Sequence, residues 1–466
     1  MNRFINREWE IKTLEDQYAF AGSSFVVLYG RRRVGKTALI REFIKDKPAL
    51  YFPAAEESDA ENRKDFAHKL AEFAGNKRHG NVVYDNWYDL AEVFKEHQTE
   101  AKKVLVIDEF PYLVSALPAF PSILQKIWDT SLMHENIMLI LCGSLIHMME
   151  KHALNYSSPL YGRRTCQIKL KQMEFQHYSE FFDEMPYRAL VERYAVTGGV
   201  PRYIELFEGK ESIFDEIGKH ILDRNSLLYE EPEFLLRHEV DEVGSYFSII
   251  KSIAAGNRRA GKISADIGIK QTSLPKYLKT LIDLDILERE VPITETNPEK
   301  SKTSLYKIKD NFIRFWFRFV YPERARLEMR QTDFVLEKIK ANFVDNHVAL
   351  IYEDVCLSHL WSLNQRRVLN FNKLGRWWNS KEEIDIVGFD SAGTDIVFAE
   401  CKYSKTPIDI GVFYELLRKK DLVPWNNINR RERFVLFSIG GFTERLSALS
   451  REREDLILYS APEGRR

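Results

Sequence analysis

The stretch 23-SSFVVLYGRRRVGKTALIREFI-44 decides the fold of this chain. An apolar run from Phe25 to Tyr29 predicts a buried strand, and apolar residues at helical spacing up to Ile44 predict a helix after it. The segment between them, Gly30 to Thr37, satisfies the pattern G-x-x-x-x-G-K-[ST]. Its glycines let the backbone turn so that several N–H groups face a phosphate group. The sequence therefore predicts a phosphate-binding loop in an α/β domain.

Each part of this loop has a predicted role in binding ATP and Mg²⁺. Lys36 is expected to reach the β- and γ-phosphates, and Thr37 to ligate the magnesium ion. The bland alternative is an ordinary glycine turn between a strand and a helix. The predicted nucleotide contacts of the loop are Gly30, Arg31, Arg32, Arg33, Val34, Gly35, Lys36, Thr37 and Ala38.

A second buried strand, 104-VLVI-107, ends in Asp108 and Glu109. A parallel strand delivers residues at its carboxyl end to the edge of the sheet where a nucleotide binds. Asp108 would hold the water shell of Mg²⁺, and Glu109 would polarise the attacking water as the catalytic base. An acidic pair after a strand is a weak signal alone, because charged residues often end strands. The upstream phosphate loop makes it a strong one.

Two further polar positions follow in the chain. Ser144 ends the apolar run 136-NIMLILCGS-144, where it fits a sensor of the γ-phosphate or an ordinary Gly-Ser turn. Arg163 and Arg164 follow a turn signal formed by Pro159 and Gly162. An arginine there would stabilise charge on the transferring phosphoryl group, in the same chain or on a neighbouring subunit. The alternative is a solvated basic turn.

Composition limits the class of protein. The chain of 466 residues is 44% hydrophobic and 29% charged, which fits several globular domains. Its 68 Lys and Arg balance 69 Asp and Glu, so any nucleic-acid-binding surface must be local. Four scattered cysteines, with no apolar run near the length of a membrane helix, predict a cytoplasmic protein that does not enter a membrane.

Several ordered motifs together resemble the AAA+-related ATPases first described from archaea, which also occur in bacteria. They are FINREWEIKTLE, YGRRRVGKTALI, VLVIDEFPYLV, LILCGS, SPLYGRR and TGGVPRYIELF. The resemblance implies that Asn6 and Arg7 lie near the base of the nucleotide. It also implies that GGVPRY, 198–203, begins a stretch of a helical lid. Leu145 departs from the small polar residue expected after Ser144.

The middle of the chain, 239–322, has the pattern of a winged-helix domain. Three short amphipathic helices are expected at 245–256, 262–269 and 271–290, followed by two strands around a polar loop. The third helix and the loop tip would offer DNA contacts through Thr272, Ser273, Lys276, Tyr277, Lys279, Lys300 and Lys302. Winged helices also mediate protein contacts, so that alternative stays open.

An aromatic stripe, 311-NFIRFWFRFVYPERARLE-328, follows this domain. Aromatic rings beside arginines can stack on single-stranded bases. More often such a stripe is core, packing one domain onto the next, and this is the interpretation that we favour here.

The C-terminal stretch 382-EEIDIVGFDSAGTDIVFAECKYSK-405 predicts a hairpin with charged groups near its ends. If its strands pair, Asp385 lies beside Glu400, and Lys402 shares a face with Glu400 because side chains alternate. Two carboxylates with the carbonyl of Ala399 or Cys401 form an oxygen-rich site that Mg²⁺ or Mn²⁺ accepts. With Lys402 to act on a water, this predicts metal-assisted phosphodiester hydrolysis. An exposed ion pair on a hairpin fits equally well.

The order Glu353, Asp385, Glu400, Lys402 resembles the PD-(D/E)XK restriction-endonuclease-like core. The motifs GRWW, EIDIV and ECKY resemble a domain of unknown function that follows the ATPase in many members of the family. The resemblance implies metal ligands at Glu353, Asp385 and Glu400, and catalytic roles for Asp385, Glu400 and Lys402. Ile384 replaces the proline of the name pattern.

The sequence thus predicts four domains. An α/β P-loop ATPase core covers 1–175, a helical lid 176–238, a winged helix 239–322 and an α/β nuclease-like domain 323–466. The predicted protein hydrolyses ATP, associates with DNA and is compatible with a homo-oligomer. Three functions compete: an ATP-regulated nuclease, a switch ATPase whose last domain only binds DNA or a partner, and a protein that acts on other proteins.

Overall fold

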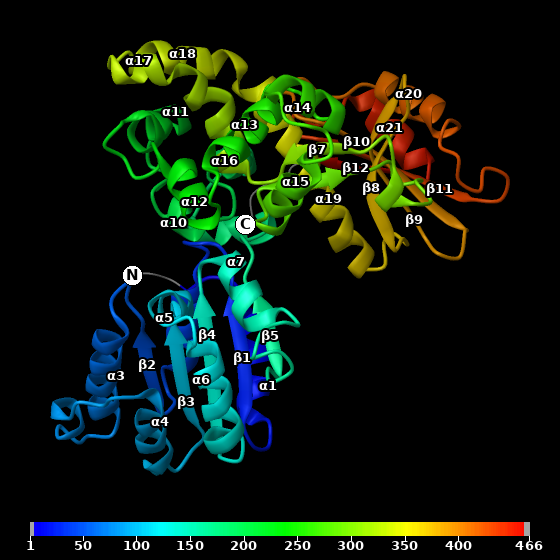
Figure 1. The fold of residues 1–466 in the computed structure, drawn as a ribbon. Coiled ribbons are helices and arrows are strands. Elements are labelled where there is room, and N and C mark those ends of the chain that lie inside the picture. The colour runs from blue at the N-terminus through cyan, green and yellow to red at the C-terminus, as the bar shows by residue number, and fades with distance from the viewer. Residues whose placement is uncertain (1–3, 461–466) are drawn as a thin grey trace. The chain divides into compact units, whose positions relative to one another are not determined.

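The computed structural model describes residues 4–460, which divide into two units. Unit 1 runs from the N-terminus to Met173 and includes Val200–Arg202, and unit 2 holds Glu174–Gly199 and everything from Tyr203 onward. Within residues 4–460, no helix combines the length and apolar composition that crossing a bilayer requires. Each unit has a five-stranded sheet of its own (Figure 1).

Unit 1 is an α/β domain around a parallel sheet in the order β2-β3-β4-β1-β5. Its strands are β1 (Ser24–Tyr29), β2 (Ala49–Pro53), β3 (Lys103–Asp108), β4 (Ile137–Gly143) and β5 (Cys166–Lys169). Its helices are α1 (Glu8–Ala19), α2 (Lys36–Ile44), α3 (Asp59–Phe73), α4 (Trp87–Glu96), α5 (Phe110–Ala116), α6 (Phe120–Ile127) and α7 (Ile146–Met149). Strands β1, β3 and β4 are buried along their whole length, which explains their unbroken apolar sequences.

The strand order brings the ends of β1, β3 and β4 to one edge of this sheet. Register pairs run from Ser24 with Met138 to Tyr29 with Gly143, and from Lys103 with Ile137 to Ile107 with Leu141. The phosphate loop, Asp108 and Ser144 therefore leave the sheet at the same edge. The predicted α/β P-loop core is confirmed by this topology.

The predicted lid and winged-helix regions form helices, which belong to unit 2 apart from Pro201 and Arg202. They are α8 (Phe175–Tyr178), α9 (Tyr187–Thr197), α10 (Pro201–Ile204), α11 (Ile213–Ile217), α12 (Glu231–Glu239), α13 (Val243–Ala254), α14 (Ala260–Ile267) and α15 (Leu274–Asp283). An antiparallel hairpin of β6 (Leu287–Glu290) and β7 (Leu305–Ile308) follows α15. The elements follow in the order predicted for 239–322, but the third helix ends at Asp283, and the first strand of the hairpin, Leu287–Glu290, occupies residues that were predicted as the end of that helix.

The aromatic stripe forms short helical turns: α16 (Asn311–Phe315), the π-helical turn η7 (Trp316–Val320) and η8 (Tyr321–Glu323). Two more helices, α17 (Arg324–Glu328) and α18 (Thr332–Phe343), lead to the long helix α19 (Ala349–Gln365). Phe312, Phe315 and Trp316 are at most 1% exposed, so most of the stripe is core, as expected.

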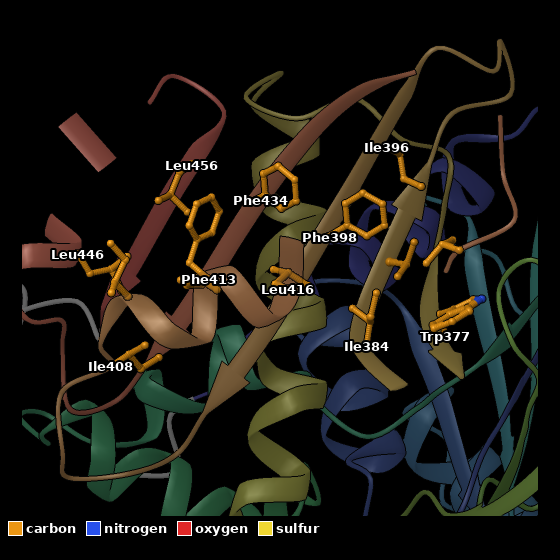
Figure 2. Close-up of a cluster of buried hydrophobic side chains, with 14 of the residues drawn as sticks. Trp377, Ile384, Ile396, Phe398, Ile408, Phe413, Leu416, Phe434, Leu446 and Leu456 are labelled. Atoms are coloured by element: carbon orange, nitrogen blue, oxygen red, sulfur yellow. The ribbon is translucent and has the colours of Figure 1, made fainter. Parts of the chain in front are cut away.

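The C-terminal sheet has the order β12-β11-β10-β9-β8. Strands β8 (Lys373–Trp378), β9 (Glu383–Phe389) and β10 (Asp395–Lys402) form an antiparallel meander, and β11 (Arg431–Ser438) and β12 (Leu456–Ser460) add in parallel. Helices α20 (Ile410–Lys420) and α21 (Glu444–Glu452) complete this part. Figure 2 shows its core, in which Phe413, Leu416 and Leu446 of these helices pack on Phe398, Phe434 and Leu456 of the sheet.

Within unit 2, the β6–β7 hairpin is joined to the C-terminal sheet. The N–H of Ile293, just after β6, donates to the carbonyl of Arg376 on β8 at 2.9 Å. Lys307 of β7 lies 2.8 Å from Asp354 of α19, and also pairs with Glu288 and Glu290. A backbone hydrogen bond and a half-buried charge network therefore hold the hairpin against the last domain.

Candidate functional site

The phosphate loop closes tightly against the chain after β5. An added Cβ at Gly30 would stand 2.3 Å from the carbonyl oxygen of Leu170, so only glycine fits there. Gly35 has φ +97° at the start of α2, a left-handed conformation that favours glycine. The loop also holds Arg33 at φ +68°. The two glycines of the sequence pattern are thus required by the geometry of the loop itself.

Lys36, Thr37 and Asp108 come together at the end of β1. The buried Lys36 ammonium donates to the carbonyls of Gly30 and Arg31 at 2.8 and 2.9 Å. The Thr37 hydroxyl donates to Asp108 Oδ2 at 3.2 Å. The loop thus presents an ammonium group, with a hydroxyl and a carboxylate beside it. These are the groups that a magnesium–triphosphate complex requires of its binding site.

Sequence reasoning missed Tyr51, which shares Asp108 with Thr37. Its hydroxyl donates to Asp108 Oδ2 at 2.6 Å from the neighbouring strand β2. Burial, together with this hydrogen bond, raises the pKa of Tyr51, which keeps the phenol protonated as a donor. The segment ALYFP predicts a strand, but only the order of strands in the sheet reveals that Tyr51 reaches Asp108.

Glu109 and Ser144 form a second pair at this edge. Glu109 adopts a left-handed conformation at φ +53°, directly before α5. Its carboxylate accepts hydrogen bonds from the Ser144 hydroxyl at 2.8 and 2.9 Å and from the Ser144 N–H at 3.2 Å. Gly143 permits this approach, because a Cβ there would lie 2.5 Å from Met149 Sδ and 2.7 Å from Pro111 Cδ. Ser144 therefore contacts the predicted catalytic base in this structure.

The Arg7 side chain reaches a backbone carbonyl of the loop, and Asn6 contacts Arg7. Arg7 is 5% exposed, and its guanidinium donates to the carbonyls of Val34 at 3.2 Å and Lys171 at 2.7 Å. The Asn6 side chain accepts the N–H of Arg7 at 2.6 Å. Burial lowers the pKa of Arg7, while Glu10 at 3.1 Å opposes that effect. Arg7 thus ties the loop to the chain after β5. Arg32 makes a contact of its own, donating to the Tyr112 hydroxyl at 2.9 Å.

Arg163 lies at the other edge of the sheet. Thr165 N–H donates to Phe25 O, at the start of β1, whereas the phosphate loop leaves the end of that strand. A strand of this length spans roughly 15–20 Å. Arg163 is also held by Asp129, with nitrogen–oxygen distances of 3.2 and 2.9 Å. Within one chain Arg163 therefore does not reach the phosphates, and of its two predicted roles only the one on a neighbouring subunit stays open.

The C-terminal hairpin brings Asp385, Glu400 and Lys402 together. Strands β9 and β10 pair with Ile386 opposite Ala399, so Asp385 and Glu400 are neighbours. The Lys402 ammonium lies 2.9 Å from Glu400 Oε2 and 3.8 Å from Asp385 Oδ2. The other Asp385 contact is the N–H of Cys401 at 2.8 Å. A cation thus already sits between the two carboxylates.

Charges around this group shift its pKa values in opposite directions. Burial and the nearby Glu400 raise the pKa of Asp385 to about 6, against the attraction of Lys402. Burial alone would raise the pKa of Glu400, but Lys402 and Lys419 lower it below its ordinary value. Lys419, on α20, pairs with Glu400 Oε1 at 2.9 Å and was not anticipated from the sequence.

Glu353 forms an ion pair with Arg376. Arg376 Nη1 lies 2.9 Å from Glu353 Oε2, and burial raises the Glu353 pKa to about 8. Among the described residues, no three His, Cys, Asp or Glu side chains converge on a point that could hold a metal ion. Glu353, Asp385 and Glu400 are therefore not gathered into one ligand set, and a predicted metal site there rests on Asp385, Glu400 and a backbone carbonyl.

A parallel sheet with a phosphate loop after one strand and an acid after another defines a P-loop nucleotide hydrolase. A family model described as an ATPase domain predominantly from Archaea matches residues 4–207, and one described as archaeal and bacterial proteins of unknown function matches 316–419. Protein MJECL04 of Methanocaldococcus jannaschii is 35% identical over 424 residues, which are 90% of this chain and 92% of that protein. The chain therefore belongs to the archaeal-type ATPase family, with the second domain following the ATPase. Membership makes ATP its ligand and ATP hydrolysis its activity.

Two further similarities are shorter or more distant. The ATP-binding protein MJ0423 of M. jannaschii is 46% identical over 44 residues, 9% of this chain and 75% of that protein. The solved Walker-type ATPase paby2304 of Pyrococcus abyssi shares 19% identity with a TM-score of 0.49, covering 68% of this chain and 96% of that one.

Proposed function

We propose that this ATPase acts on DNA, with a helical lid at 176–238, a winged helix at 239–322 and a metal-dependent nuclease domain at 323–466. ATP bound by the loop from Gly30 to Ala38 would be hydrolysed with Lys36 on the phosphates, Thr37 and Asp108 on the magnesium shell and Glu109 on the water. The cycle would reposition the DNA-contacting domains.

The single observation that carries the nuclease proposal is the position of Lys402 between Glu400 and Asp385, at 2.9 and 3.8 Å. Asp385 and Glu400 already lie beside one cation, and their carboxylates would be the side-chain ligands of a divalent cation at this place. When bound, Mg²⁺ or Mn²⁺ supplies Lewis-acid activation of a phosphodiester and its attacking water. Lys402, released from the carboxylates, would orient that water.

DNA contact by the winged helix is supported by the exposed side chains on and before α15. Thr272, Ser273, Lys276 and Lys279 are exposed, and the loop tip exposes Lys300 and Lys302. Tyr277 is less available, because its hydroxyl donates to Glu242 at 2.9 Å. Exposed lysines and hydroxyls on a third helix are suited to phosphate contacts along a duplex.

A second candidate is a switch ATPase whose last domain only binds DNA or a protein. It is favoured by the charge pairing of Glu400, whose carboxylate is matched by both Lys402 and Lys419. A carboxylate that is already neutralised by lysine has less need of a metal ion.

The test is plasmid cleavage by the full-length protein with Mg²⁺ or Mn²⁺, with and without ATP. Lys402→Ala is expected to lower the cleavage rate by about 100-fold or more. Lys405→Ala, which removes an exposed lysine three residues away, is the matched control and is expected to cut normally. Cleavage that survives Lys402→Ala would remove Lys402 from the mechanism. Absence of cleavage with both metals would favour the second candidate, a switch ATPase.

A further inference from the structure

A cavity of about 730 Å³ lies entirely within unit 2 and is lined by none of the residues of the ATP site or of the nuclease-like group. Its walls come from the C-terminal end of α13, from the turns η7 and η8, and from α17 and α18. We call it the cationic groove and define it by Lys251, Arg318, Tyr321, Arg324, Lys338 and Asn342. Its volume lies in the range of small-ligand pockets, roughly 300–1,000 Å³.

The charge of the groove has one sign. Four cationic side chains line it, and no Asp or Glu is among its described lining residues. Arg324 is paired with Glu230 and Glu233, and Lys338 with Glu323. That leaves two cations whose charge is not neutralised at the groove.

Those two cations are Lys251 and Arg318, both of which are exposed. Within residues 4–460, neither forms an ion pair with a carboxylate; Arg318 makes only a long hydrogen bond, 3.4 Å, to the Ala254 carbonyl. Unpaired cations on a concave surface attract an anion more strongly than cations on a flat one, because the low-dielectric walls concentrate the field. The ligand that complements this groove is therefore anionic.

Aromatic surface lies between these charges. Tyr321 is half-buried; the Lys251 ammonium lies over its ring, 5.5 Å from the centroid, and the rings of Phe247 and Phe317 lie 4.8 and 5.9 Å away. Phe317 and Phe319 are 2% and 7% exposed, so they back the groove while Tyr321 and the exposed Pro322 offer its accessible apolar surface. The aromatic stripe is thus core along most of its length but open at this end.

A ring with cations beside it suits a ligand that carries both a planar base and a phosphate. The cavity admits single nucleotides, whereas a duplex keeps its bases stacked inside and could present only its backbone. We propose that the cationic groove binds a nucleotide unit of single-stranded nucleic acid, with Lys251 and Arg318 on phosphates and Tyr321 stacked on a base. This goes beyond the function proposed above and depends on neither the ATP site nor the nuclease-like residues.

The proposal is tested by fluorescence anisotropy of a labelled oligothymidylate with the full-length, ATP-free protein. The double variant Lys251→Glu/Arg318→Glu is expected to bind at least about 100-fold more weakly and to lower the slope of log K against log salt by about 1.4, the value for two phosphate contacts. The control Lys373→Glu/Lys405→Glu reverses the same charge at exposed positions of unit 2 outside the groove, and should bind as the parent does. Equal losses in both double variants, or no loss in the first, would overturn the proposal.

A second pair of variants tests the aromatic part without changing charge. Tyr321→Leu is expected to weaken binding by about 5- to 100-fold, the range for loss of one stacked base, while Tyr321→Phe keeps the ring and the affinity. Thermal melting establishes that each variant is folded. If Tyr321→Leu binds as tightly as Tyr321→Phe, stacking is refuted. If thymidine monophosphate displaces the strand at the concentrations at which the strand itself binds, the ligand is a free nucleotide and the strand assignment fails.

Discussion

Ser144 engages both carboxylate oxygens of Glu109, through its hydroxyl at 2.8 and 2.9 Å and its N–H at 3.2 Å. Ser144, which is expected to sense the γ-phosphate, is thus hydrogen-bonded to Glu109, which is expected to activate water. Since Glu109 can polarise water only from a fixed position, Ser144 is placed to set that position. The two side chains are expected to act as one unit in hydrolysis.

Glu109→Gln should lower the rate of ATP hydrolysis by about 100- to 10,000-fold, because the amide cannot accept a proton from the attacking water. ATP affinity, measured by calorimetry, should stay within a few-fold of the parent. Ser144→Ala should lower turnover by about tenfold through loss of alignment. Combining the two should cost little more than Glu109→Gln alone, and additive losses would refute a shared role.

Gly30→Ala should abolish nucleotide binding and lower the melting temperature, because its Cβ would meet the Leu170 carbonyl at 2.3 Å. Backbone atoms on both sides must then shift. Gly218→Ala is the matched control, since a Cβ there meets nothing within 4 Å. Differential scanning calorimetry with and without ATP measures both effects. A Gly30→Ala protein that ATP still stabilises would contradict the tight loop.

Arg163 can assist hydrolysis only from another copy of the chain, because it lies at the far edge of the sheet. Lys36→Ala should abolish turnover by removing the phosphate contact, and Arg163→Ala should lower it if Arg163 is a finger. Mixing the two inactive variants should then restore part of the activity, since mixed assemblies contain an intact loop facing an intact arginine. A mixture with no more activity than its parts would leave Arg163 with a structural role beside Asp129.

Glu353 should make stability fall with rising pH. Its pKa is raised to about 8 in the folded chain, so the folded state binds a proton that the unfolded state has released. Stability is therefore fully present below the ordinary carboxyl range and is lost as pH rises toward about 8. Urea unfolding of the metal-free protein from pH 5 to 8.5 measures the slope, and Glu353→Gln should flatten it. An unchanged slope in that variant would assign the effect to other groups.

The sequence predicts best what is local. The loop from Gly30 to Thr37 and the acids after β3 are recognisable because each lies in a short segment with its own strand or helix. The approach of Asp385 to Glu400 was also predictable, since a hairpin fixes its own pairing. The geometry of these elements is determined by residues that lie close together in the sequence.

What the sequence could not predict depends on neighbours that are distant along the chain. Tyr51 reaches Asp108 only because β2 lies beside β3, and Lys419 reaches Glu400 only through the packing of α20 on the sheet. Arg163 follows a turn, but its sequence does not say at which end of β1 that turn lies. The ion pair between Arg376 and Glu353 is a long-range contact of the same kind.

The backbone bond from Ile293 to Arg376 has a mechanical consequence. It continues the ladder of the last sheet into the segment after β6, and Lys307 anchors β7 to α19. The hairpin and that sheet should consequently unfold in one cooperative step and move as one rigid body. Any hinge that moves this body relative to the preceding helices of unit 2 therefore has to lie before β6.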